Sequence, residues 1–222
     1  MFKKFFDTLK KKPLTKQIIE KSIESISLNK QMFLNARTAL RTKGNLEMAQ
    51  LVLKEDKIIN KSERTIRRKL LTHFALSDKI DIGSGFTISS IVIDIERIGD
   101  YAKNIADLAI LMKDDYNCGV FENQVKSIED KVGTIFDKTL KAFEDHNAEL
   151  AREVIHIYKN EISGECSHIK DKLIKGENGL SKGNAIVTAL YLRSIKRISA
   201  HLHNISTSIL NPFPRIGYKE KK

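Results

Sequence analysis

Two stretches of the chain place acidic and amide side chains at helical spacing. The first set, at positions i, i+4, i+8 and i+11, is Glu96, Asp100, Asn104 and Asp107. The second set, at positions i, i+4 and i+7, is Asp56, Asn60 and Glu63. Each set falls on one face of a helix. Carboxylate and amide oxygens suit hard cations such as Mg²⁺, Mn²⁺, Ca²⁺ or oxidised iron, so the two faces together are a candidate metal site.

Repulsion between the acids supports this interpretation, although an alternative stays open. Like charges at i and i+4 destabilise a helix by roughly 0.2–0.5 kcal/mol, and two such faces on neighbouring helices repel unless a positive group lies between them. A metal ion is one such group. Arg97 or Lys103 is another, and acids at this spacing are also common on ordinary solvated faces.

The sequence of the helix that carries the first acidic set recurs later in the chain. Residues 95–105 and 195–205 share isoleucines, an arginine and an asparagine at matching positions, one hundred residues apart. Lys196 and Ala200 stand where the first copy has Glu96 and Asp100. Such self-similarity indicates an internal repeat. The loss of the acids predicts no comparable metal site in the second copy, whose Lys196 and Arg197 instead form a basic face for an acidic or phosphate-bearing partner, or simply a solvated one.

Apolar residues recur at steps of three and four along most of the chain, and no segment alternates with the period of a strand. Gly and Pro divide the pattern into six helical stretches, at about 14–43, 45–76, 86–112, 121–143, 147–175 and 181–210. The prediction is an all-α protein of two tandem antiparallel three-helix bundles related by a pseudo-twofold repeat. Its predicted parts are a basic N-terminal segment at 1–13, repeats at 14–114 and 115–212, and a basic tail at 213–222.

Composition favours a globular cytoplasmic protein. The chain has 222 residues, of which 41% are hydrophobic and 30% charged. No apolar run approaches the roughly 18 residues needed to span a bilayer. The N-terminus lacks the features of a secretory signal peptide. Cys118 and Cys166 have no metal-ligand spacing and are expected to be ordinary reduced thiols.

The formal net charge of +11 is concentrated at the two ends of the chain. Residues 1–16 hold six lysines against one aspartate, and residues 181–222 hold eight lysines and arginines against one glutamate. This distribution indicates either an anionic contact at the ends or tails that keep the protein in solution.

The first twelve residues have the pattern of a basic amphipathic helix. Its proposed contact residues, aromatic at helical spacing and flanked by lysines, are Phe2, Phe5, Phe6, Lys3 and Lys4. Such a segment can lie on an anionic membrane surface. It can equally dock on the bundle with its phenylalanines buried. Either way the protein is expected in the cytoplasm, with a peripheral contact at the inner membrane face as one alternative.

The stretch Ile93–Ala106, with its Glu-x-x-x-Asp core and following asparagine, resembles the signature helix of the PhoU family of phosphate-uptake regulators. The stretch Val52–Ile66 is similar to the partner motif of that family on the preceding helix. The resemblance covers residues 14–212 and implies two three-helix bundles, a polynuclear metal site and a regulatory, non-enzymatic role. The ligand set that it implies is Glu96, Asp100, Asp107, Asp56 and Glu63, supported by Asn60 and Asn104.

The function that these features favour is regulation of phosphate uptake and intracellular phosphate homeostasis. The expected partners are a phosphate transporter component, a phosphate-sensing kinase or both, with a homodimer as a further expectation. The bound metal in the first repeat is expected to be iron, manganese, magnesium or zinc. The chain is not expected to be an enzyme.

Two other functions fit parts of the sequence. A basic helical bundle could be an adaptor or bind nucleic acid. No specific nucleic-acid recognition is expected, because base reading or stacking side chains are scarce on the basic sixth helix. A carboxylate-metal oxidase would need Glu-x-x-His pairs on two helices. Here both pairs, Glu153 with His156 and Glu165 with His168, fall on one helix.

Overall fold

The computed structural model describes residues 13–76, 81–112, 115–177 and 179–220, and within them it confirms the predicted all-α class. The first repeat contains α2 (Pro13–Arg41), α3 (Leu46–Leu76) and α4 (Ile82–Leu111). The second contains α5 (Glu122–Asp145), α6 (Ala148–Ile157), a π-helical turn (Tyr158–Ile162), α7 (Ser163–Ile174) and α8 (Lys182–Leu210). Short 3₁₀ turns cover Gly119–Phe121 and Phe213–Arg215.

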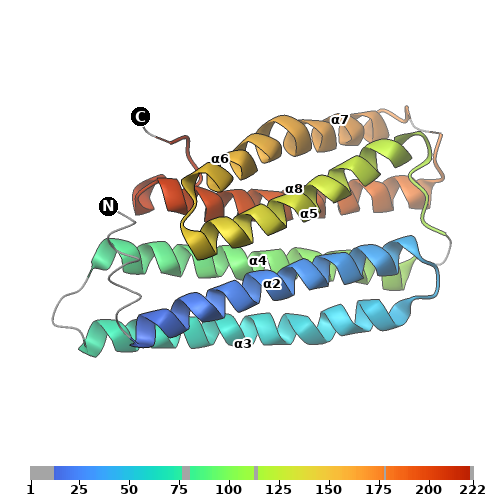
Figure 1. Ribbon diagram of the computed structural model, residues 1–222. Helices are drawn as coiled ribbons and strands as arrows, with labels where there is room; N and C mark the ends of the chain where they lie inside the picture. Colours follow the sequence, from blue (N-terminus) through green and yellow to red (C-terminus); the bar gives the residue numbers. More distant parts are fainter. Residues whose placement is uncertain (1–12, 77–80, 113–114, 178, 221–222) are drawn as a thin grey trace.

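The two bundles lie side by side, and α4 and α8 face each other along the interface between them (Figure 1). The helix of α6 and α7, drawn in orange, covers the outer side of the second repeat (Figure 1). The core follows the duplicated apolar stripe. Its buried members in α4 and α8 include Ile91, Ile95, Ile98, Ala102, Ile105, Ile195, Ile198, Leu202 and Ile205. Both copies of the repeat therefore still build a bundle.

Helix α4 begins at Ile82, earlier than the predicted start near Phe86. Its N-cap is Asp81, whose Oδ1 accepts a hydrogen bond from the Ser84 backbone N–H at 3.2 Å. A Cβ at Gly85 would lie 1.8 Å from the ring of Phe74. The glycine that suggested a loop is therefore needed for close packing between α3 and α4.

The fifth predicted helix is interrupted by the π-helical turn at Tyr158–Ile162. The corresponding helix of the first repeat, α3, is α-helical throughout. A π-turn inserts extra backbone and changes which side chains face inward beyond it. The hydrophobic spacing alone had predicted a continuous helix.

None of the helices in the described part of the chain combines the length and apolar composition needed to cross a bilayer. The N-terminal contact residues Phe2, Phe5, Phe6, Lys3 and Lys4 lie outside the described residues. The amphipathic segment therefore stays a prediction.

Candidate functional site

Helices α3 and α4 bring acids from both predicted sets to a common face around Glu96. Burial raises the pKa of Glu96 above its ordinary value, and the negative charges of Asp100, Glu63 and Asp56 raise it further, while Arg97 lowers it. Three carboxylates from two helices thus act on a fourth. The predicted ligands Glu96, Asp100, Glu63 and Asp56 are therefore electrostatically coupled.

Positively charged side chains currently pair with the outer members of this acidic face. Arg97 Nη1 lies 2.8 Å from Asp100 Oδ2, and Arg67 Nη2 lies 2.8 Å from Glu63 Oε1. Both arginine side chains are about half exposed, at 54% and 50%. Ion pairs of this kind contribute about 0–1 kcal/mol, because water competes with them. These pairs balance the charge at the rim of the acidic face, and another cation could replace the arginines.

Asp56 forms the deepest part of the face and is 7% exposed. Its Oδ2 lies 3.3 Å from Lys103 Nζ and accepts a hydrogen bond from Asn60 Nδ2 at 3.1 Å. Asp107 is half-buried, one turn beyond Lys103 on α4. Lys103 thus lies among the predicted ligands and offers the alternative way of neutralising them.

As the side chains stand, no group of three or more His, Cys, Asp and Glu within the described ranges is arranged to hold one metal ion. Carboxylate oxygens are nevertheless the donors that hard cations prefer, and the acids of α3 and α4 act electrostatically on the partly buried Glu96. A hollow of about 360 Å³ lies beside them on α3, lined by Lys57, Asn60, Glu63 and Arg64. The metal ligands remain a prediction.

Asn104 lines a groove of about 410 Å³ between α4 and α8. It lines that groove with Tyr101 on its own helix and with Arg193 and Ser194 on α8. On α4, Asn104 lies between the acidic face and the side that faces α8. Its spacing from the acids alone therefore did not show that it lines the groove.

The place equivalent to the acidic face in the second repeat is occupied by Lys196. Its Nζ donates a hydrogen bond to Ser167 Oγ on α7 at 2.7 Å. Its charge also acts on the buried Cys166, although burial dominates and raises the pKa of that thiol to about 12. Arg197 donates from Nε to the Tyr101 hydroxyl across the repeat interface at 3.1 Å. Both predicted contact residues thus have partners within the chain.

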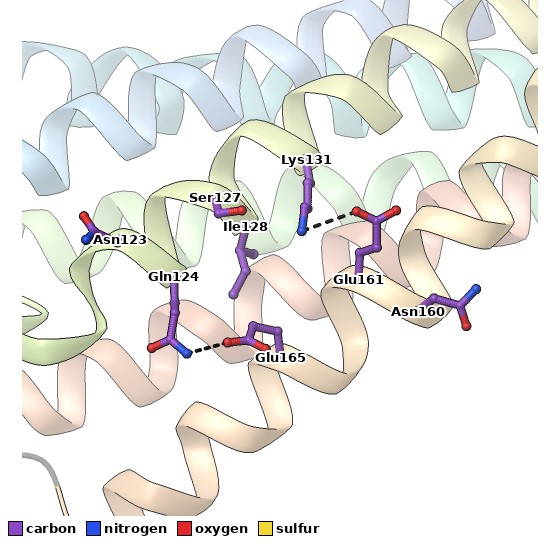
Figure 2. A pocket seen from close by; sticks show the side chains of 8 residues that line it. All are labelled: Asn123, Gln124, Ser127, Ile128, Lys131, Asn160, Glu161 and Glu165. Atoms are coloured by element: carbon purple, nitrogen blue, oxygen red, sulfur yellow. Dashed lines mark hydrogen bonds and ion pairs between the residues drawn. The ribbon is translucent and has the colours of Figure 1, made fainter.

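Two acids of the second repeat, Glu161 in the π-helical turn and Glu165 in α7, lie on the side that faces α5. Figure 2 shows them in a polar groove of about 390 Å³, where each is paired. Gln124 Nε2 donates to Glu165 Oε1 at 2.7 Å, and Lys131 Nζ lies 3.3 Å from Glu161 Oε2. Lys131 balances the charge of Glu161, whereas Glu165 accepts its hydrogen bond from a neutral amide.

The sequence pattern did not single out Asp94, which is 7% exposed and joins α4 to α8. Asp94 Oδ1 lies 2.7 Å from His201 Nδ1 and accepts a hydrogen bond from Asn204 Nδ2 at 3.0 Å. The rings of His201 and Tyr101 stack, with centroids 5.8 Å apart. The available signal was the difference between the copies, because Ser194 stands at the position equivalent to Asp94.

A second polar junction between the repeats centres on Arg41 at the end of α2. Its guanidinium contacts Glu122 and Glu129, each at 2.7 Å, and Tyr191 donates its hydroxyl hydrogen to Glu129 at 2.6 Å. Burial by itself would lower the pKa of Arg41, but the two glutamates raise it overall. Arg41 therefore stays charged and fixes the first repeat on α5 and α8.

Comparison with known proteins matches both halves of the chain to one domain. The family model described as "PhoU domain" matches residues 23–109 and 125–209. The "Phosphate-specific transport system accessory protein PhoU homolog" of Pseudomonas putida is 30% identical over 73% of this chain, and the match spans 65% of that relative.

Solved structures share the same fold. The crystal structure of PhoU from Pseudomonas aeruginosa aligns with a TM-score of 0.81 and 25% identity, over 89% of this chain and 95% of that one. A phosphate transport system regulatory protein PhoU from Streptococcus pneumoniae has a TM-score of 0.77 at 21% identity, covering 87% and 92% of the two chains. The second match supports the fold alone.

Proposed function

The chain belongs to the PhoU family, and from that premise we propose that it regulates phosphate uptake as an accessory protein of a phosphate transporter. The family is a regulatory one, and the curated relatives are named as accessory proteins of the phosphate-specific transport system. Under this proposal the chain acts through binding, without catalysing a reaction. It controls the transporter, a phosphate-sensing kinase or both.

The observation that carries the proposal is the acidic face of α3 and α4 in a chain whose halves both match the family model. We propose that Glu96, Asp100, Glu63 and Asp56 hold a metal ion there, with Asp107 and Asn60 beside them. The metal would supply the positive charge that stabilises the converging carboxylates. The exposed Arg67 and Arg97 would turn outward into water when the ion binds.

Binding of an ion would fix α3 against α4 and present a defined surface to the transporter. The carboxylates of both helices would then share one cation, which opposes relative movement of the two helices. A surface that changes with metal loading suits regulation by contact. Iron, manganese, magnesium and zinc are the candidate ions.

The basic ends of the chain are the proposed contacts with the partner or with the membrane next to it. The N-terminal segment would supply Phe5, Phe6 and its lysines, and α8 would supply Lys196 and Arg197. A chain with Phe5→Ser and Phe6→Ser should recover less transporter from detergent-solubilised membranes than the unchanged chain does. Equal recovery would show that the N-terminus is not part of the contact.

A homodimer, measurable by light scattering, is part of the same proposal.

Phosphate uptake by living cells tests the function. Cells without this protein should lose the normal restraint of phosphate uptake when phosphate is plentiful, measured with radiolabelled phosphate. The wild-type chain should restore it, and the variant Glu96→Gln with Asp100→Asn should restore it poorly. The matched control is Glu161→Gln with Glu165→Gln, which removes two acids from the second repeat (Figure 2). Unchanged uptake in cells without the protein would contradict the proposal.

A further inference from the structure

The interface between the repeats contains two equivalent halves, of which one holds an internal carboxylate and the other does not. Tyr101 and His201 occupy equivalent positions in the repeat and stack on each other, with ring centroids 5.8 Å apart. The pseudo-twofold axis therefore passes between these two rings. Side chains on one side of the stack have counterparts on the other.

On the first side the carboxylate of Asp94 is held by α8. His201 Nδ1 lies 2.7 Å from Asp94 Oδ1, and Asn204 Nδ2 donates to the same oxygen at 3.0 Å. Asp94 is 7% exposed. Hydrogen bonds to a buried carboxylate are of the strong, charge-assisted kind. This half is built around an oxyanion that the chain itself supplies.

On the second side the counterparts are present without the carboxylate. Asn104 matches Asn204, Tyr101 matches His201, and Ser194 matches Asp94. Asn104, Tyr101 and Ser194 line the groove of about 410 Å³ between α4 and α8. None of the described residues that line this groove is acidic, and the serine is shorter than the aspartate of the other half.

Positive charge gathers at this second half. Arg193, which is exposed, lines the groove with Asn104 and Ser194. Arg197 donates to the Tyr101 hydroxyl at 3.1 Å, and its guanidinium lies 5.9 Å from the centre of that ring. Guanidinium groups with amide and hydroxyl donors are the usual means of binding phosphate and carboxylate oxygens.

We propose that this groove binds a small oxyanion, a phosphate or a carboxylate, where Asp94 places its own carboxylate in the equivalent half. Asn104 and Tyr101 would donate to its oxygens, and Arg193 would neutralise its charge from the rim. The site bridges the two repeats, so the bound anion would strengthen their contact. This inference does not depend on a metal at the acidic face.

Calorimetric titration of the full chain with inorganic phosphate tests this site. Saturable binding is expected, and Arg193→Gln should weaken it by about threefold to fivefold, because water screens the charge of an exposed arginine. The matched control is Arg68→Gln, an exposed arginine on α3, which should leave the affinity unchanged. Acetate in place of phosphate distinguishes the sources: tighter phosphate binding assigns a phosphate ligand, and tighter acetate binding assigns a carboxylate.

Ser194→Asp is the complementary variant, because it restores on α8 the carboxylate that Asp94 provides on α4. It should abolish binding of the added anion while leaving the helical circular dichroism intact. If this variant fails to fold, the exposed Arg193→Gln substitution still decides the matter. No saturable binding of either anion, or equal affinity in Arg193→Gln and wild type, would overturn the proposal. Glu96→Gln with Asp100→Asn should leave anion affinity unchanged, so this test and the metal test fail separately.

Discussion

The α3/α4 face of the first repeat and the α7/α8 face of the second occupy equivalent places in the two bundles (Figure 1) but have opposite charges. In the first, the charges of three neighbouring acids raise the pKa of Glu96 further above the level set by burial. In the second, Lys196 stands in its place and bonds to Ser167. The apolar stripe was retained in both copies, because both must form a bundle. The polar face was free to change. The comparison shows that the architecture was kept while the charge of the polar face changed after duplication.

The largest effect on this comparison should come from Gly99, where α4 packs closely against its own repeat. A Cβ there would lie 3.1 Å from Asn29 Oδ1 and 3.3 Å from Ile59 Cγ2, whereas Ser199 is accommodated at the equivalent buried position. Gly99→Val should lower the free energy of unfolding by about 3 kcal/mol, measured by urea denaturation. The control is Gly133→Val on α5, where a Cβ would meet nothing within 4 Å. Equal losses would contradict the tighter packing of the first repeat.

Asp94 and Ser194 provide the next comparison, at equivalent positions in the repeat interface. Asp94→Ala should cost about 2 kcal/mol, because it leaves His201 and Asn204 without their buried acceptor. Ser194→Ala should cost much less, since Ser194 Oγ bonds only to the Leu190 carbonyl of its own helix among the contacts found. Thermal unfolding of the two variants measures the difference. Similar midpoints would show that the halves of the interface are equivalent after all.

Lys196→Gln should have a smaller effect, of about 1 kcal/mol, because it removes one charged donor to Ser167. The substitution should also leave metal content unchanged, since no acids of the second repeat are grouped to hold a metal within the described residues. Elemental analysis beside urea denaturation checks both expectations. A gain of metal in this variant would mean that the lysine alone had kept an ion out of the second repeat.

The smallest effect concerns Glu96 in metal-free protein and has a definite pH dependence. A raised pKa in the folded state means that the folded chain takes up this proton before the unfolded chain does. The contribution of Glu96 to stability is therefore unfavourable at neutral pH and becomes less so as pH falls through the raised folded pKa towards its ordinary value.

Glu96→Gln should remove this dependence. In chelator at neutral pH it should stabilise the protein by about 0.5 kcal/mol, and the advantage should shrink on acidification. Urea denaturation of variant and wild type at several pH values measures this difference. With metal present the sign should reverse, because a ligand is lost. A variant that is less stable than wild type without metal would contradict the repulsion among the acids.

The sequence predicted the six helical stretches, because they follow from helical periodicity. It could not predict that Gly85 lies inside α4, since the reason is the ring of Phe74 on another helix. Nor could it predict the partners of Asp94, which come from the opposite repeat. Features that depend on spacing along one helix could be predicted from the sequence. Features that depend on contacts between helices could not.

Metal content after gentle purification tests most directly the central claim that only the first repeat binds metal. Elemental analysis should find a bound ion in the wild-type chain and in the Glu161→Gln, Glu165→Gln control. It should find a large loss in Glu96→Gln with Asp100→Asn. Wild-type protein without metal that takes up none on titration, or metal retained in full by the Glu96 and Asp100 variant, would contradict the account.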